Sequence, residues 1–286
     1  MMASDNCLKI FFLTCLLIII FAIPTAASEN KTQDVIQQTG DGTLNWTKGL
    51  ITATGTSTPS DKKNKVQQSV ALAAAKAKAV KNLLAVIMSI QLGNHNTVGD
   101  FAKDNDIFLN KLHEMGTRAK VISQEYLSDA TVKVKIQISL FGGLSQFVLP
   151  NEIKQVEAIK PVTGSRPADS DRSGNTFSGL IVDATGLGCK PAMVPLLYDE
   201  NGNIVFGPAF VSREFVVQQG MARYFSGSLS NQSDAGAGNN PLLIKGLSVQ
   251  GPKNINIIIS NTAAAKLLGA SGHLLFLKQC RVIIII

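Results

Sequence analysis

The sequence predicts an α+β protein. A small antiparallel sheet packed on one long helix, with a second helical stretch, forms the first half, and a mainly β domain with a short helix forms the second. An alanine-rich segment without glycine or proline, residues 62–92, and the strict alternation of residues 131–140 predict the first half. The second half has short apolar runs separated by turn residues, which is typical of strands. The expected domains span residues 43–150 and 176–286.

The first 28 residues are expected to be a secretory signal peptide. Lys9 precedes an apolar run over residues 10–23, and small residues follow at 25–28. This run is shorter than the roughly 20 residues that a spanning helix needs, so an uncleaved anchor is the less favoured alternative. No lipobox pattern precedes Cys15. We therefore expect a periplasmic or secreted protein that is not lipidated and has no transmembrane span after leader removal.

The long helix is the packing element of the first domain. Its apolar residues recur at alternating spacings of four and three, which places them on one face: Val66, Val70, Ala73, Ala77, Val80, Leu84 and Ile87. Small residues in this stripe allow a close approach to a sheet. Ser60 or Asp61 is expected to cap the start, and Gly93 to take the left-handed conformation after the end.

Strands are expected on both sides of the long helix. Residues 43–57 are rich in threonine and predict one extended strand with a bend at Gly49, preceded by a loosely ordered polar segment. Residues 97–115 predict a weaker helix or a pair of helices. A hairpin over 119–127 and 131–140 follows, and its second strand alternates apolar residues with Lys133, Lys135, Gln137 and Ser139.

Several segments of the first half together resemble a known family. They are GLITATGTS, AAAKAKAVKNLL, VGDFAKDNDIFLNKL and GTRAKVISQEYLSDATVKVKIQISL. Over residues 44–149 the chain resembles the Lpp-twenty family of outer-membrane lipoproteins, and a similar domain stands at the N-terminus of flagellar assembly protein T. The resemblance implies an α+β fold, a cell-envelope location and a non-enzymatic role without a family active site. The family's lipid-attachment cysteine is missing here.

Residues 151–175 combine proline, glycine, serine and mixed charge and predict a linker. Strands are then expected at 177–184, 192–199, around 203–207, at 254–260 and at 280–286, with a short helix at 262–268. Residues 210–224 fit a strand or a helix. The apolar end of the sequence is expected inside the sheet, since an exposed edge of four isoleucines would aggregate. This half is similar to the C-terminal region of uncharacterised secreted bacterial proteins that carry the same first domain.

The positive charge is spread along the chain. The formal net charge is +7. Lys78 and Lys81 on the long helix, with Lys133 and Lys135 on the hairpin, are a candidate surface for an anionic partner, either an envelope protein or another envelope component. The alternative is that these lysines are ordinary solvated side chains. Nothing in the pattern predicts nucleic-acid binding.

No catalytic residue, cofactor or metal ligand can be assigned from spacing, since the histidines are scattered and no nucleophile motif occurs. Asp183 and Arg213 are the candidate ligand-binding residues, because they lie within or beside apolar strands, although structural pairing is the favoured explanation for such charges. Cys189 and Cys280 could form a disulfide that closes a loop of about 90 residues and contributes about 4 kcal/mol, or could remain two buried thiols.

These observations favour a non-enzymatic binding or structural protein of the cell envelope. An envelope or flagellar assembly role follows from the resemblance alone. The alternative is an envelope hydrolase or a small-ligand-binding protein that uses the second domain, with Asp183 and Arg213 near the site. A shared pocket around these two residues would favour that alternative.

Overall fold

The computed structural model describes residues 33–286, apart from residues 62, 152, 155–176, 228–235 and 270. The predicted signal peptide at 1–28 lies outside the described residues. So does most of the predicted linker at 151–175. The proposed domain boundaries therefore stay a prediction, and the two sheets are described below as parts of one compact unit that spans residues 31–286.

The N-terminal sheet has five antiparallel strands in the order β2-β3-β4-β6-β5. These are β2 (Ile36–Thr39), β3 (Gly42–Asn45), β4 (Leu50–Ser57), β6 (Val132–Ser139) and β5 (Lys120–Tyr126). The hairpin of β5 and β6 is confirmed. The single strand expected over residues 43–57 is wrong, because the chain reverses before Gly49, which has a φ of +63°, and β3 and β4 pair with each other. The preceding segment is also more ordered than expected, since it forms β2 and the short strand β1 (Gln33–Asp34).

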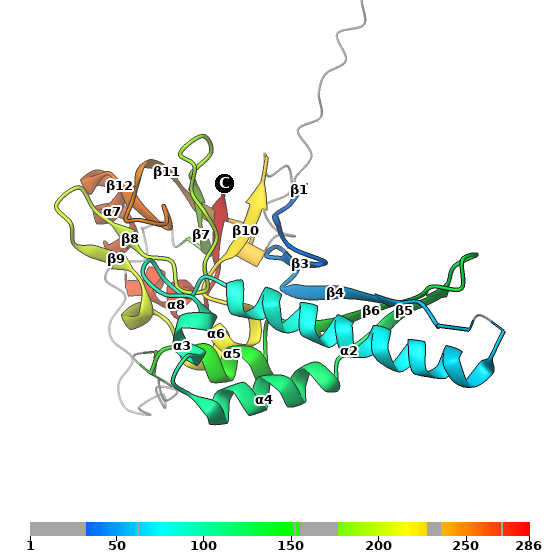
Figure 1. Ribbon diagram of the computed structural model, residues 1–286. Coiled ribbons are helices and arrows are strands. Elements are labelled where there is room, and N and C mark those ends of the chain that lie inside the picture. Colours follow the sequence, from blue (N-terminus) through cyan, green and yellow to red (C-terminus); the bar gives the residue numbers. More distant parts are fainter. Residues whose placement is uncertain (1–32, 62, 152, 155–176, 228–235, 270) are drawn as a thin grey trace, which may run out of the picture. The chain divides into compact units, whose positions relative to one another are not determined.

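Helix α2 (Lys65–Ser89) packs across one face of this sheet, over β4 and β6 (Figure 1). The approach is close at Gly55, where a β-carbon would overlap the main chain of Ala75 and Ala79. Asn64, rather than Ser60 or Asp61, caps the helix, because its side chain accepts a hydrogen bond from the N–H of Val66 at 2.9 Å. The helix ends at Ser89, before the expected Gly93.

The apolar stripe expected on α2 is only partly buried. Val80 and Ile87 are in the core, but Val66 and Val70 are 69% and 56% exposed. The residues that face the core lie about a third of a turn around the helix from the expected stripe and include Ala71, Ala75, Ala79, Leu83 and Val86. Ala73 and Ala77 of the expected stripe are exposed, so the predicted buried face is wrong over most of the helix. Small side chains occupy the N-terminal part of this face because the strand backbone lies so near.

The second helical stretch is a pair of helices, as one of the two expectations had it. Helix α3 (Val98–Ala102) and helix α4 (Asp106–Thr117) follow α2, and both pack against it. Gly116 of α4 lies beside Val80 and Leu84, since a β-carbon there would come 3.1 Å from the side chain of Val80. Helix α5 (Gly143–Val148) follows β6.

The C-terminal sheet has eight strands in the order β1-β10-β13-β7-β11-β12-β8-β9. Its centre is parallel, from β10 through β13 and β7 to β11. The strands after β1 are β7 (Gly179–Asp183), β8 (Leu197–Tyr198), β9 (Ile204–Phe206), β10 (Arg223–Ser226), β11 (Pro241–Gln250), β12 (Asn256–Ile259) and β13 (Val282–Ile285). The expectation that the isoleucine-rich end pairs inside the sheet is confirmed, because β13 lies between β10 and β7 and is buried along its whole length.

Short helices accompany this sheet. They are the 3-10 turn η2 (Pro208–Phe210), α6 (Arg213–Gln219), α7 (Asn261–Leu268) and α8 (Ser271–Lys278). Residues 210–224 thus contain a helix followed by a strand. Ser260 caps α7, since its hydroxyl accepts a hydrogen bond from the N–H of Ala263 at 3.2 Å. The expected α+β fold, with a mainly β C-terminal region, is confirmed.

The two sheets share one hydrophobic core. Trp46, in the turn between β3 and β4, meets the ring of Tyr224 on β10 edge to face, with ring centroids 5.8 Å apart. Its indole N–H donates to Gln37 Oε1 at 3.1 Å. Trp46 is therefore a core residue. The hydroxyl of Thr47 donates to the carbonyl of Tyr224 at 2.6 Å and ties the same turn to the second sheet.

None of the helices within the described ranges is both long and apolar enough to cross a membrane.

Candidate functional site

A basic surface pocket of about 440 Å³ lies where the two sheets meet; we call it the Lys190–Lys253 pocket. The N-terminal sheet contributes the start of β2, the end of α2 contributes Ser89, and the connection after α2 contributes Gln91. The C-terminal region contributes the loops before β8 and before β12. The residues that the argument uses are Gln37, Ser89, Gln91, Lys190, Lys253 and Ile255.

Main-chain hydrogen bonds fix the two lysine-bearing loops next to each other. The N–H of Lys190 donates to the carbonyl of Asn254 at 2.9 Å. Asn254 has a φ of +54°, a left-handed conformation that asparagine tolerates better than most residues. The N–H of Lys253 donates to Asn94 Oδ1 at 3.3 Å. The backbone of both lysines is therefore held in place, while their side chains reach solvent.

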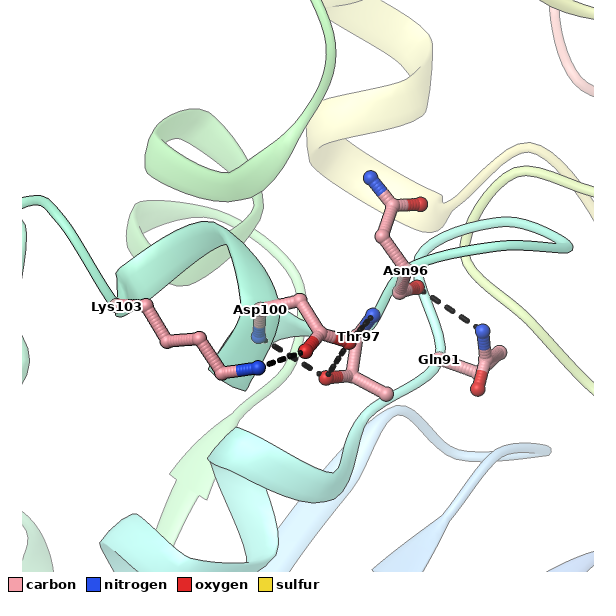
Figure 2. A network of polar contacts seen from close by, with 5 residues as sticks. All are labelled: Gln91, Asn96, Thr97, Asp100 and Lys103. Atoms are coloured by element: carbon pink, nitrogen blue, oxygen red, sulfur yellow. Dashed lines mark hydrogen bonds and ion pairs between the residues drawn. The ribbon is translucent and has the colours of Figure 1, made fainter.

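The connection between α2 and α3 carries Gln91 to the pocket, and a polar network holds this connection in shape. Figure 2 shows the amide nitrogen of Gln91 donating to the carbonyl of Asn96, at 2.9 Å. Next to it, Thr97 and Asp100 form a capping box at the start of α3. Lys103 pairs with Asp100 at 2.8 Å, and this contact is the main cause that holds the pKa of the Asp100 carboxyl well below its usual range.

The same connection docks on the C-terminal region. The N–H groups of Met193 and Val194 donate to the carbonyls of Gln91 and Leu92, at 3.0 and 2.8 Å. These two bonds join the connection to the loop before β8. They keep the wall that contains Gln91 at a fixed position relative to the loop that carries Lys190, so the pocket is largely preformed.

The chemistry of the pocket suits an anionic group with some apolar surface. Neither Lys190 nor Lys253 forms an ion pair within the described part of the chain. The Oε1 of Gln37 accepts a hydrogen bond from the indole N–H of Trp46. The amide nitrogen of Gln37 is therefore left as a donor to a ligand. Buried Ile255 provides an apolar wall. Two ammonium groups and an amide donor are the groups that bind phosphate or carboxylate.

The four lysines predicted as a partner surface do not lie on one face. Gly55 of β4 faces α2, and its register partner on β6 is Val134, so Lys133 and Lys135 point to the opposite side of the sheet. Lys78 and Lys81 are exposed on α2 itself, which covers the other side. Lys133 also pairs with Glu125, at 3.6 Å. An anionic partner therefore cannot meet both pairs on one flat contact surface.

Asp183 and Arg213, the predicted ligand residues, lie near opposite ends of β13. Asp183 is opposite Ile285, at the end of that strand, and accepts a hydrogen bond from the N–H of Thr185 at 3.0 Å. The hydroxyl and the N–H of Thr185, with a smaller effect of the Lys245 charge, lower the pKa of Asp183.

Arg213 lies near the start of β13, because the neighbouring Ser212 donates its N–H to the carbonyl of Lys278. Its guanidinium donates to the carbonyls of Gln146 and Pro150, each at 3.0 Å. It therefore fixes the end of α5. Neither Asp183 nor Arg213 lines the Lys190–Lys253 pocket. The structure thus gives each charge a local partner and does not bring the two together.

Cys189 and Cys280 are buried free thiols in the structure. Burial raises the pKa of Cys189 to about 11 and that of Cys280 to about 12. Such thiols are poor nucleophiles at neutral pH, because only the thiolate attacks. In the described ranges, no cluster of three or more histidine, cysteine or acidic side chains is arranged to hold a metal ion.

Comparison with known proteins gives one family match for the C-terminal region. Residues 179–286 match the family model of the second domain of Treponema pallidum Tp0624. The match begins at the first residue of β7 and covers less than half of the chain, so it states a similarity of this region. No curated protein matches the chain significantly. The resemblance of residues 44–149 to the Lpp-twenty family is not shown by these comparisons and remains a prediction.

Sequence reasoning missed the Lys190–Lys253 pocket altogether. Its two lysines come from loops 63 positions apart, each beside a proline, and nothing in their local sequence marks a site. The only indirect signal is the pair of turn-forming stretches around them, GCKP and GPKN, which place both lysines in loops.

Proposed function

We propose that this protein is a non-enzymatic binding module of the bacterial cell envelope that holds a phosphate-bearing group in the Lys190–Lys253 pocket. The observation that carries the proposal is the pair of lysines, each without an ion-pair partner in the described chain, on loops tied together by main-chain hydrogen bonds. Preformed cationic sites of this kind bind anions without a large ordering cost. The expected leader peptide and the Lpp-twenty resemblance support the envelope location.

An envelope surface offers such a group in the headgroups of anionic lipids. A flagellar assembly role is a narrower form of the same proposal and has only the resemblance to flagellar assembly protein T in its favour. The similarity of residues 179–286 to the second domain of Tp0624 adds a relative in a bacterium but no activity.

The volume of the pocket also favours a second candidate, the binding of a small soluble anion. About 440 Å³ lies within the range of pockets that hold small molecules, and buried Ile255 supplies the apolar contact that such ligands use. The same two lysines would then bind a soluble phosphate ester instead of a lipid headgroup.

Two binding measurements separate these candidates. The first is co-sedimentation with vesicles of phosphatidylcholine that contain phosphatidylglycerol, and the second is calorimetry with glycerol 3-phosphate. We expect Lys190→Gln and Lys253→Gln each to weaken vesicle binding about fivefold, since one lysine near an anionic surface contributes about 1 kcal/mol. Binding to the vesicles alone supports the envelope surface as the source, and binding of the soluble ester supports the small ligand.

Lys76→Gln is the matched control. Lys76 is exposed on α2, thirteen residues before Ser89, and therefore roughly 20 Å from the pocket. The proposal is wrong if the wild type binds neither probe, or if Lys76→Gln weakens binding as much as the two pocket variants do. Circular dichroism of each variant checks that the fold is unchanged.

A further inference from the structure

Strand β5 is an open edge of the N-terminal sheet. It stands last in the strand order and pairs only with β6. Six of its seven residues are exposed, and Val121, Ile122 and Tyr126 are 41%, 40% and 58% exposed. Unpaired N–H and C=O groups on a strand of this length, beside apolar side chains, are a template for another strand. Lysines and bulges usually blunt such an edge, and β5 has Lys120 and an irregularity at Ile122, but no strand of the described chain pairs with its outer side.

An irregularity at Ile122 decides which side chains of β5 share a face. Lys120 lies opposite Gln137 of β6, and Glu125 lies opposite Lys133. Positions 133 and 137 are four apart on a regular strand, so their side chains point to the same side of the sheet. Lys120 and Glu125 therefore also share a side, although they are an odd number of residues apart.

The same shift places Val121 and Gln124 on the other side of the sheet. Val121 lies opposite Ile136 and Gln124 opposite Val134, and both partners are buried under α2. Because α2 packs on β4 and β6 and not on β5, Val121 stays partly exposed on this side.

We propose that β5 pairs in an antiparallel manner with β5 of a second copy of this chain, with Lys120 of each copy opposite Glu125 of the other. In this register Val121 lies opposite Gln124, and Ile122 lies opposite Ser123. Every pair at the ends of the contact joins side chains from the same side of the sheet, as antiparallel pairing requires. The result is a continuous ten-stranded sheet that runs through both copies.

The charges favour a second copy over an unrelated strand. A two-fold axis between the strands creates two Lys120–Glu125 pairs at once, one at each end of the contact, because an isologous contact uses every interaction twice. Opposite charges directly across an antiparallel pair stabilise it, and like charges destabilise it. Within one copy the hydroxyl of Ser123 donates to Glu125 Oε1 at 2.7 Å and Lys133 pairs with Oε2 at 3.6 Å. Each carboxylate oxygen has a second lone pair that can accept from Lys120 of the other copy.

Charge reversal tests this register directly. Lys120→Glu and Glu125→Lys change exposed side chains, and each alone places like charges opposite each other at both ends. We expect the wild-type protein to dimerise in sedimentation velocity, and each variant to associate at least about tenfold more weakly. An equimolar mixture of the two variants restores opposite charges at both ends, so it should form a heterodimer about as stable as the wild-type dimer.

Lys76→Glu, an exposed charge reversal on α2, serves as the control and should leave the association unchanged. Three results would overturn the proposal. They are a wild-type protein that stays monomeric up to about 0.1 mM, a mixture of the two variants that associates no better than either alone, and a control variant that weakens association equally.

Discussion

Replacing Gly55 by alanine tests the closest contact in the N-terminal half, the one between β4 and α2. The new methyl group would stand 2.9 Å from the Cα of Ala79 and nearer still to the main chain of Ala75. Ordinary contacts at a β-carbon begin near 3.4 Å. Because the neighbouring atoms belong to a helix backbone, no side-chain rotation relieves the overlap, and α2 has to move away from the sheet.

The expected cost follows from these contacts. One extra methylene in a well-packed site costs about 1–3 kcal/mol, and the upper end applies where backbone must shift. Movement of α2 also loosens the packing of Ala75 and Leu83, which are fully buried. About 0.5–1 kcal/mol of this cost is offset, because alanine loses less conformational freedom on folding than glycine does. We therefore expect Gly55→Ala to lower the free energy of unfolding by at least about 2 kcal/mol.

Urea denaturation followed by circular dichroism measures this change. With an m-value of about 3 kcal/mol per molar, the midpoint should fall by roughly 0.7 M or more. Gly93→Ala is the matched control, since the nearest atom to its β-carbon would be 3.8 Å away and its φ is not positive. A Gly55→Ala midpoint equal to that of the control would refute the close contact between α2 and β4.

Three further predictions concern the core and the C-terminal region. Tyr224→Phe removes the hydroxyl that donates to the carbonyl of Ala192 and accepts from its N–H. The free energy of unfolding, measured by urea titration, should therefore fall by about 1–3 kcal/mol. Burial raises the pKa of the Cys189 and Cys280 thiols from 9 to about 11 and about 12, so the unfolded chain loses these protons first and binds fewer of them above pH 9. The free energy of unfolding, measured by urea titration at each pH, should therefore fall between pH 9 and 11, by up to about 1.4 kcal/mol per pH unit for each thiol. Arg213→Lys cannot span two carbonyls at the end of α5, and we expect a loss of about 1–2 kcal/mol with faster proteolysis near residue 150.

Each of these predictions has its own contrary result. A Tyr224→Phe variant as stable as Tyr198→Phe, whose ring is only partly buried, would show that the hydroxyl bonds contribute nothing. A double variant with serine at both cysteine positions should flatten the decline between pH 9 and 11, and an equal decline in that variant would assign it to other groups. Unchanged proteolysis of Arg213→Lys would mean that the end of α5 is held by other contacts.

Local patterns predicted the elements that depend on local chemistry. The alternation of β6 fixes its buried face, because Val132, Val134 and Ile136 are buried in the structure as the period of two requires. The length and composition of residues 62–92 predicted α2 to within three residues at each end. The uninterrupted isoleucines of β13 predicted a strand that pairs inside the sheet, and the parallel pairing of this buried strand is a finding of the structure.

Elements that depend on distant partners were missed. Strand β11 is ten residues long, but no element was predicted there. It contains Pro241 and Gly246, and its pairing with β7 and β12 defines it. The apolar stripe of α2 was predicted on the wrong face, since Val66 and Val70 are exposed while Ala71, Ala75 and Ala79 are buried. Alanines occur on most sides of residues 71–79, so spacing alone does not report which face the sheet covers.

The candidate site could not be predicted for the same reason. Asp183 and Arg213 were selected because charges beside apolar strands need partners, and each has found one locally, in Thr185 and in the carbonyls at the end of α5. Lys190 and Lys253 carry no such local signal. Their proximity arises from the hydrogen bond between Lys190 and Asn254, which is a property of the folded chain.

The placement of β1 affects the order in which this protein assembles. Gln33 and Asp34 pair with Ser226 and Phe225 of β10, almost 200 residues later, while the next strand of the chain already belongs to the other sheet. During synthesis the N-terminal sheet and α2 can complete themselves before β10 leaves the ribosome. Strand β1 then stays unpaired until β10 is available. Contacts of such sequence separation slow folding, so we expect the pairing of β1 with β10 to form late.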